Sequence, residues 1–306
     1  MDAPLPSGEQ YEIVAGDYRA VAVGVGGGLR ELTHAGRALI EGYPPDALPD
    51  GGRGQVLAPW PNRVRDGKWT WRDKHLQLAL SEPAKGNASH GLVRWVGWGA
   101  TRRSPDRVVL SHRLPPHPGY PFTLDLAITY AVDARAGLSV ELSASNPGPG
   151  PAPVALGVHP YLAAPAGGLV DGCTLQVPAR TRVLVDERSI PTGTQSVQGT
   201  PYDLRSPRIL RDLVLDTAFT DLEPDADGRI RIVLAAEDGT ATELWTQAPA
   251  RWVQVFTGDP LTPARRRRGV AVEPMTAPAN ALATGEGLSV LDPGQSLTLT
   301  WGILAR

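Results

Sequence analysis

The sequence predicts an all-β protein, a large antiparallel β-sandwich, and three observations support this. Runs of alternating apolar and polar residues recur at short, regular spacing. Turn dipeptides such as Asp227-Gly228 and Asp238-Gly239 separate these runs. No segment has a long helical period, and only residues 207–213 are compatible with one or two helical turns. Because no linker divides the pattern, we expect a single domain over residues 1–306.

Individual strands are predicted where the alternation is clearest. In chain order these segments are 18–25, 29–33, 75–80, 108–114, 123–132, 138–145, 153–158, 172–177, 181–185, 229–234, 240–245, 252–257, 269–273 and 296–303. The three runs between residues 108 and 145 follow one another through short turns and predict an antiparallel meander. Gly26-Gly27-Gly28 indicates a bend and not a phosphate-binding loop, because the segment after it is too short for a helix.

The composition limits the classes of partner and compartment. Lysine and arginine number 30 against 32 acidic residues, so no global field would attract nucleic acid or an acidic membrane surface. A targeting pattern at the amino terminus and apolar runs of about 18 residues are both absent from the sequence, so we expect a cytoplasmic protein. Cys173 is the only cysteine, which excludes an intrachain disulfide, and its alternating context predicts a packed side chain.

Two segments place an ionisable side chain where an extended run meets a proline. Glu273 shares its predicted strand face with the small Ala271, and His159 shares its own with Gly157. The proline after each favours an extended backbone at the ionisable residue and ends the predicted strand. Either side chain alone is compatible with a capped strand end. A histidine and a glutamate that both have space beside them fit a two-sided proton transfer.

Two polar loops carry further candidates. Asn62 and Arg63 lie in a loop bounded by prolines, where the guanidinium could hold hydroxyl or carboxylate oxygens or pair with a structural carboxylate. His90 precedes Gly91 and fits either a pocket wall or a capped turn. The tryptophans that could stack on a sugar ring, or else fill the core, are Trp60, Trp95 and Trp98.

Other polar residues have a simpler interpretation at this level. Asp216 begins a strand-like segment and alone is compatible with a turn cap. Arg265-Arg266-Arg267-Arg268 is interpreted as a solvated loop, because a nucleic-acid patch needs more charges with aromatic residues beside them. His112 and His117 lack the spacing of helical metal ligands, and we predict no metal site.

Five motifs occur in the order found in aldose 1-epimerases, the galactose mutarotase family, and the chain resembles that family over nearly its whole length. The motifs are Asn62-Arg63, Asn87-Ala88-Ser89-His90-Gly91, Gly157-Val158-His159-Pro160-Tyr161, Leu215-Asp216-Thr217-Ala218-Phe219 and Val272-Glu273-Pro274. The resemblance implies a galactose mutarotase-like supersandwich that holds a sugar on its concave face, without a metal or other cofactor.

The resemblance also implies roles for these residues. Glu273 would be the general base at the anomeric hydroxyl, His159 the general acid, and His90 an assistant at the ring oxygen. Arg63 and Asp216 match residues that hold sugar hydroxyls. Asn62 and Trp60 are added as substrate-binding candidates from their place in the first loop. The expected function is interconversion of the α and β anomers of a hexose such as glucose or galactose.

Two alternatives to this function stay open. A hexose-6-phosphate 1-epimerase would need basic residues for the phosphate, which the arginines at 265–268 could supply. A non-catalytic sugar-binding relative would not need both Glu273 and His159. The chain departs from many family members at Leu92, where a second glycine is common, and at Trp60-Pro61, so the motifs do not identify the preferred sugar.

Overall fold

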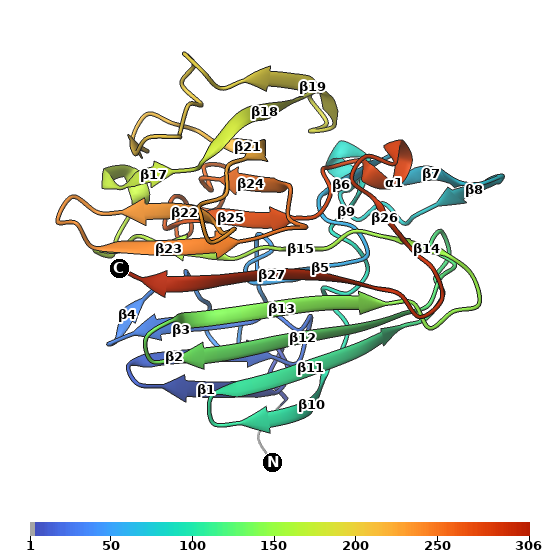
Figure 1. The fold of residues 1–306 in the computed structure, drawn as a ribbon, viewed down its shortest axis with the longest axis horizontal. Coiled ribbons are helices and arrows are strands. Elements are labelled where there is room, and N and C mark those ends of the chain that lie inside the picture. Colours follow the sequence, from blue (N-terminus) through green and yellow to red (C-terminus); the bar gives the residue numbers. More distant parts are fainter. Residues whose placement is uncertain (1–3) are drawn as a thin grey trace.

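A nine-stranded antiparallel sheet runs across the front of the molecule in Figure 1. The computed structural model describes residues 4–306. In spatial order the strands of this sheet are β10 (Gly99–Ser104), β11 (Arg107–Leu114), β12 (Leu124–Asp133), β13 (Gly137–Ser145), β27 (Ser296–Ala305), β23 (Ala241–Thr246), β22 (Ile230–Ala235), β17 (Thr174–Gln176) and β20 (Arg208–Ile209). Strands β11 to β13 confirm the predicted meander, and β12 buries every second residue as its alternation requires.

An eight-stranded antiparallel sheet carries most of the predicted site residues. Its order is β19 (Pro191–Ser196), β18 (Ala179–Val185), β21 (Asp216–Leu222), β24 (Trp252–Phe256), β25 (Gly269–Met275), β15 (Gly157–Val158) and β5 (Val56–Leu57). The remaining strand, β16 (Tyr161–Ala163), pairs with β25 next to β15. Segments from the first, middle and last thirds of the chain therefore meet in one sheet.

Smaller elements complete the fold. A four-stranded sheet contains β1 (Gln10–Ala15), β2 (Tyr18–Val23), β3 (Leu29–His34) and β4 (Arg37–Ala38), and β1 and β2 contact β11 to β13. Three strand pairs are β6 (Arg63–Arg65) with β9 (Asn87–Ser89), β7 (Lys68–Trp71) with β8 (Lys74–Gln77), and β14 (Ala152–Val154) with β26 (Ser289–Leu291). The helical turns are η1 (Pro83–Lys85), η2 (Val170–Gly172) and α1 (Ala281–Thr284).

One apolar core joins the inner faces of the large sheets. Ile128 and Trp301 of the nine-stranded sheet belong to the same buried cluster as Val253 and Val272 of the eight-stranded sheet. Each fully buried side chain of this size stabilises the fold by about 1.5–3 kcal/mol relative to an exposed one. Cys173 is buried in this cluster, which confirms its predicted packing role. This packing gives β24 and β25 a rigid base for the polar residues on their other face.

Residues 207–213, the only segment whose pattern is compatible with helical turns, form no helix. Arg208–Ile209 instead forms β20, where Ile209 pairs with Thr174 at the edge of the nine-stranded sheet. Pairing with an available sheet edge therefore outweighed a weak local helical preference. The α-helical turn occurs at Ala281–Thr284, where it was not predicted. Among residues 4–306, no helix is both long enough and apolar enough to cross a bilayer.

Candidate active site

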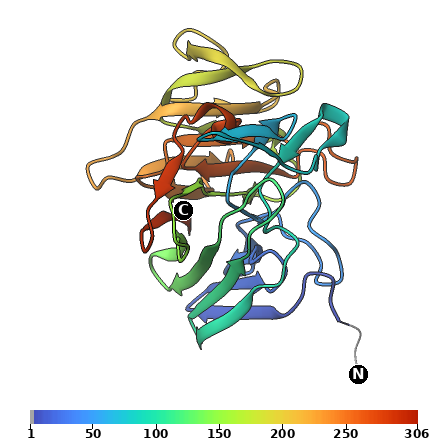
Figure 2. The ribbon, with the colours of Figure 1, turned by 90° about the vertical axis from the view of Figure 1, so that its right-hand side faces the viewer.

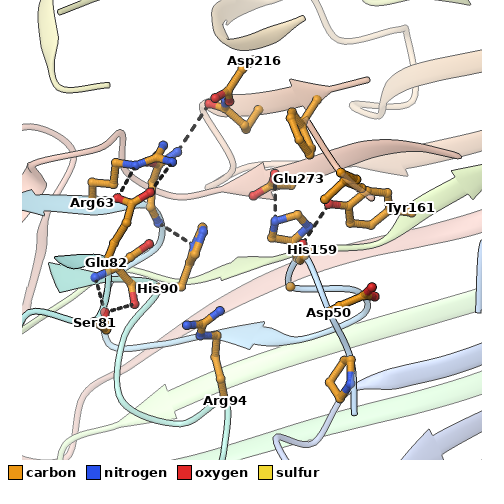
Figure 3. A pocket seen from close by; sticks show the side chains of 18 of the residues that line it. Asp50, Arg63, Ser81, Glu82, His90, Arg94, His159, Tyr161, Asp216 and Glu273 are labelled. Atoms are coloured by element: carbon orange, nitrogen blue, oxygen red, sulfur yellow. Dashed lines mark hydrogen bonds and ion pairs between the residues drawn. The ribbon is translucent and has the colours of Figure 1, made fainter. Parts of the chain in front are cut away.

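A cavity of about 510 Å³ lies at the polar face of the eight-stranded sheet. Figure 2 shows segments from the first third of the chain beside strands from its last third, and the cavity forms where these segments meet. The predicted site residues that line it are Asn62, Arg63, His90, His159, Asp216 and Glu273 (Figure 3). The fold therefore brings together six side chains that are as far as 211 positions apart in the sequence.

Glu273 lies within β25 and is 2% exposed. The sequence predicted that the strand ends at Glu273, but it continues through Pro274 to Met275. On one side of β25, β16 pairs at Ala271 and β15 pairs at Met275, so Pro274 lies in the gap between these two partners. A proline in that gap is compatible with a continuing strand. On the other side, Gln254 of β24 lies directly opposite Glu273.

His159 follows β15 and faces Glu273. Its backbone N–H donates to the carbonyl of Gln55 at 3.1 Å, and its carbonyl accepts from Gly54 N–H at 2.8 Å. Its Nε2 atom lies 3.3 Å from Glu273 Oε1. The ring stacks on Tyr161 with 5.2 Å between centroids and 9° between planes. Backbone and ring contacts thus hold the imidazole in a fixed orientation toward the carboxyl group.

Burial acts on the pKa of both members of this pair. It raises the pKa of Glu273 well above its usual range and lowers the pKa of His159 to about 3. Both shifts have the same cause, because a charge on either side chain loses its hydration in the closed site. Glu273 Oε2 and His159 Nδ1 are also buried without a hydrogen-bond partner in the described chain. Burial therefore favours the neutral imidazole of His159 and the neutral carboxyl group of Glu273.

His90 forms the adjacent wall of the cavity. Its ring centroid lies 5.5 Å from that of His159, and Asn62 N–H donates to its Nδ1 at 3.1 Å. Because Nδ1 accepts this bond, the neutral ring carries its proton on Nε2. Burial is the main cause that lowers the pKa of His90 well below its usual value, and the charge of Arg94 also contributes. His90 is therefore a neutral hydrogen-bond donor near neutral pH.

Asn62 and His90, which form this hydrogen bond, both have a left-handed backbone conformation. Asn62 has a φ of 55° and His90 a φ of 61°. Such conformations are costly for residues other than glycine and persist where surrounding contacts enforce them. His90 N–H donates to Asn62 O at 2.8 Å, and Arg63 pairs with Ser89 between β6 and β9. These contacts fix the two loops against each other at the cavity.

Arg63 pairs with a structural carboxylate, one of the two roles that its sequence context allowed. Its Nε and Nη2 atoms donate to Glu82 at 2.8 and 3.0 Å, so a carboxylate orients the guanidinium. The same side chain lines the cavity. Asp216 accepts a hydrogen bond from Gln254 Nε2 at 2.6 Å, and Gln254 Oε1 accepts from Asn62 Nδ2 at 3.4 Å. This network positions an amide, a carboxylate and a guanidinium for hydrogen bonds with a polyhydroxylated ligand.

The sequence was compared with models of protein families and with the sequences of known proteins. The family model described as aldose 1-epimerase matches residues 9–303. The chain belongs to the aldose 1-epimerase family. The YihR protein of Escherichia coli K12, itself described as uncharacterized, is 34% identical over 314 residues, which cover 98% of this chain and 94% of that protein.

Solved structures show that the chain has the fold of this family. A GalM/aldose epimerase homologue from Caenorhabditis elegans has a TM-score of 0.85 at 20% identity, with 97% of this chain and 99% of that chain covered. A galactose 1-epimerase from Lactobacillus acidophilus has a TM-score of 0.79 at 20% identity, with coverages of 95% and 92%. The predicted galactose mutarotase-like β-sandwich is confirmed.

Trp60 was wrongly predicted to bind substrate in this member of the aldose 1-epimerase family. It is 2% exposed, does not line the cavity, and packs with its ring centroid 6.4 Å from that of Tyr120. It belongs to the buried core, where burial of a large aromatic surface stabilises the fold. Trp95 is the tryptophan that reaches the cavity, and it is 53% exposed.

The arginines at 265–268 are not a uniformly solvated loop. Arg265 Nη1 lies 2.9 Å from Glu41 Oε1, and the buried Arg267 binds Asp259 Oδ1 at 2.9 Å. Carboxylates from distant segments therefore neutralise these two side chains, which the local charge run could not reveal. None of the four arginines lines the cavity, so they provide no phosphate site there.

Several residues of the cavity were missed by the sequence analysis. Gln254 is a buried polar side chain in the otherwise apolar β24, and this break in pattern was an available signal. Tyr161 lies in the same motif as His159 but was not assigned a role. No sequence pattern marked Arg94 or Glu82 as cavity residues, because only the fold brings them to the cavity. Residues 4–306 contain no cluster of three or more side chains arranged for a metal ion.

Proposed function

We propose that this protein is an aldose 1-epimerase that interconverts the α and β anomers of a hexose. The observation that carries the proposal is the buried pair of His159 and Glu273, 3.3 Å apart in a cavity of about 510 Å³. A cavity of this size accommodates a single sugar ring. Ring opening needs one group that accepts a proton and one that donates a proton on the same ligand, which this pair supplies.

Burial favours the proton of the pair on Glu273, so in the proposed reaction this proton first moves to His159 and leaves Glu273 as the carboxylate that acts. Glu273 accepts the proton of the anomeric hydroxyl while His159 protonates the ring oxygen, so the bond between C1 and the ring oxygen breaks. The C1 oxygen becomes the aldehyde oxygen of the open chain. Rotation about the C1–C2 bond and the reverse proton transfers then close the ring on the other face. The net result is a change of configuration at C1, and the enzyme regains its initial protonation state.

The surroundings of the pair favour these transfers. Ring opening leaves Glu273 protonated and His159 neutral, which removes both charges from a buried site. The positive charge of Arg63 opposes the effect of burial on the pKa of Glu273 and so supports its carboxylate form before the transfer. The Nε2–H of His90 provides a second donor toward the ring oxygen. Arg63, Asp216 and Asn62 orient the sugar through its hydroxyls.

The direct test follows anomer conversion by nuclear magnetic resonance in freshly dissolved α-glucose and α-galactose and in their 6-phosphates. The proposal predicts conversion faster than the spontaneous rate for at least one free hexose. A strong preference for the phosphates would indicate a hexose-6-phosphate 1-epimerase instead. Binding of sugars without acceleration for any aldose would leave only a sugar-binding protein.

A further inference from the structure

Arg94 lines the cavity and has no compensating carboxylate among the residues that the structure describes. Its Nη1 atom donates to the neutral Gln55 Oε1 at 3.3 Å, and its Cζ atom lies 5.7 Å from the centre of the Trp95 ring. Within residues 4–306 no acidic side chain pairs with it, whereas Arg63 binds Glu82. Burial lowers the pKa of Arg94, and no acidic neighbour offsets this effect. A partly desolvated positive charge therefore faces the cavity.

The position of Arg94 indicates which group of a bound sugar it could contact. Figure 3 shows its guanidinium pointing toward His90 and His159, with Asp216 on the far side of these histidines. After burial, its charge is one of the causes that lower the pKa of both histidines. In the proposed reaction His159 serves the ring oxygen, which is bonded to C1 and C5. The exocyclic C6 group is attached to C5, so in that orientation it would lie on the histidine side of the sugar, toward Arg94.

The charges around the cavity limit the group that Arg94 can bind. Arg63 is already neutralised by Glu82, and Asp50 and Asp216 add negative charge to the lining. Arg94 is therefore a single available positive charge. A phosphate dianion would bring two negative charges to this one guanidinium, whereas a carboxylate or a sulfo group brings one and can accept two parallel hydrogen bonds.

We infer that the preferred substrate is an aldose whose C6 position carries a monoanionic group, a carboxylate or a sulfonate, which is bound by Arg94. This inference rests on the proposed epimerase function and specifies its substrate class. Arg94 is a specificity-determining residue in this account, and it takes no part in the proton transfers. Hydrogen bonds between a guanidinium and an anion are strong enough to change kcat/KM by about tenfold to a hundredfold.

The test compares anomer exchange in glucose, glucuronate, glucose with a sulfonate in place of the C6 hydroxyl, and glucose 6-phosphate. We expect kcat/KM for at least one monoanionic sugar to exceed that for glucose by about tenfold or more. Arg94→Gln should bring this ratio close to one. Arg94→Lys should restore part of it, because the charge returns without the planar fork. Arg102→Gln, which removes the same charge from an exposed position on β10, is the matched control and should keep the wild-type ratio.

Three outcomes would overturn the inference about Arg94 without affecting the proposed epimerase function. The first is an equal kcat/KM for glucose and both monoanionic sugars, and the second is a kcat/KM for glucose 6-phosphate above that for the monoanionic sugars. The third is a ratio of monoanionic sugar to glucose that Arg94→Gln leaves unchanged. In each of these, acceleration of some aldose would leave the epimerase function intact. If no aldose is accelerated, the proposed function itself fails. The Arg94 variants are first compared with wild type by circular dichroism and thermal unfolding, and the substrate ratio of the wild-type protein decides the inference if a variant does not fold.

Discussion

At the scale of single residues, burial gives His159 and Glu273 the properties that proton transfer requires. Both residues are at most 5% exposed, and neither side chain finds partners for all of its polar atoms within the described chain. Water would normally stabilise either charge, so its exclusion makes the neutral forms more accessible. The short distance between Nε2 and Oε1 then lets one proton serve both groups. Their titration belongs to the pair and not to either residue alone.

The pH dependence of activity tests this shared proton. The active pair carries one proton, so kcat/KM should fall at low pH when a second proton binds and at high pH when the last one leaves. Burial lowers the pKa of His159 to about 3, so the acid limb should lie well below the value of about 6.5 of a free imidazole. Burial raises the pKa of Glu273, so the alkaline limb should lie far above the usual carboxyl range. An acid limb centred near pH 6.5 would contradict this electrostatic account.

The sequence pointed to most cavity residues one by one, for local reasons. Glu273 and His159 follow small residues on their strand faces and precede prolines, and these features are visible without a fold. Trp60 and Trp95 could not be told apart, because only the packing around each decides which one reaches the cavity. Whether the Arg94 guanidinium is free to bind a ligand depends on which carboxylates lie close to it in the folded chain. Sequence alone does not contain that information.

At the scale of elements, the loop that leads to β5 shapes the surroundings of His159. Gly52 has a φ of +79°, and a Cβ atom there would lie 2.7 Å from Cδ2 of His159 and 2.9 Å from its Nε2. Both the backbone conformation and the lack of space favour glycine at this position. The imidazole is thus confined between this loop on one side and the ring of Tyr161 on the other.

Replacing Gly52 tests whether this confinement matters for activity. Gly52→Ala should displace the imidazole from Glu273 and lower kcat by about tenfold or more, because small misplacements of catalytic groups are costly. Anomer-resolved magnetic resonance measures the rate. Gly36→Ala is the matched control, since Gly36 has a similar φ of +77° but open space around its Cβ position. Equal activities of the two variants would show that the loop does not position His159.

The predictability of the elements depended on their length. Long alternating strands such as β12 and β13 were predicted nearly residue by residue, since their period alone defines a buried face. A strand of two residues, such as β5, carries no period and is defined only by its partners. The same reason explains why β20 was not predicted as a strand. The single strand predicted at 153–158 divides into β14 and β15, which belong to different sheets.

At the scale of the whole molecule, the site is a product of long-range pairing. Strands β15, β16, β21, β24 and β25 bring His159, Tyr161, Asp216, Gln254 and Glu273 to one face of a sheet, and the β6–β9 pair adds Arg63 and His90. The all-β class followed from the repeated alternation. The order of strands in each sheet did not, because a period of two fixes which face is buried but not which strands pair.

The measurement that tests the central claim most directly is the anomerisation rate of Glu273→Gln, with His159→Asn beside it. Each variant removes one side of the proton transfer, so each should lower kcat by about a hundredfold or more while unfolding like wild type. Glu237→Gln removes one negative charge from an exposed residue that does not line the cavity, so it controls for the loss of charge. Rates near the spontaneous value in both site variants and a normal rate in the control are the predicted result. A wild-type rate in either Glu273→Gln or His159→Asn would contradict the assignment of this pair as the acid and base.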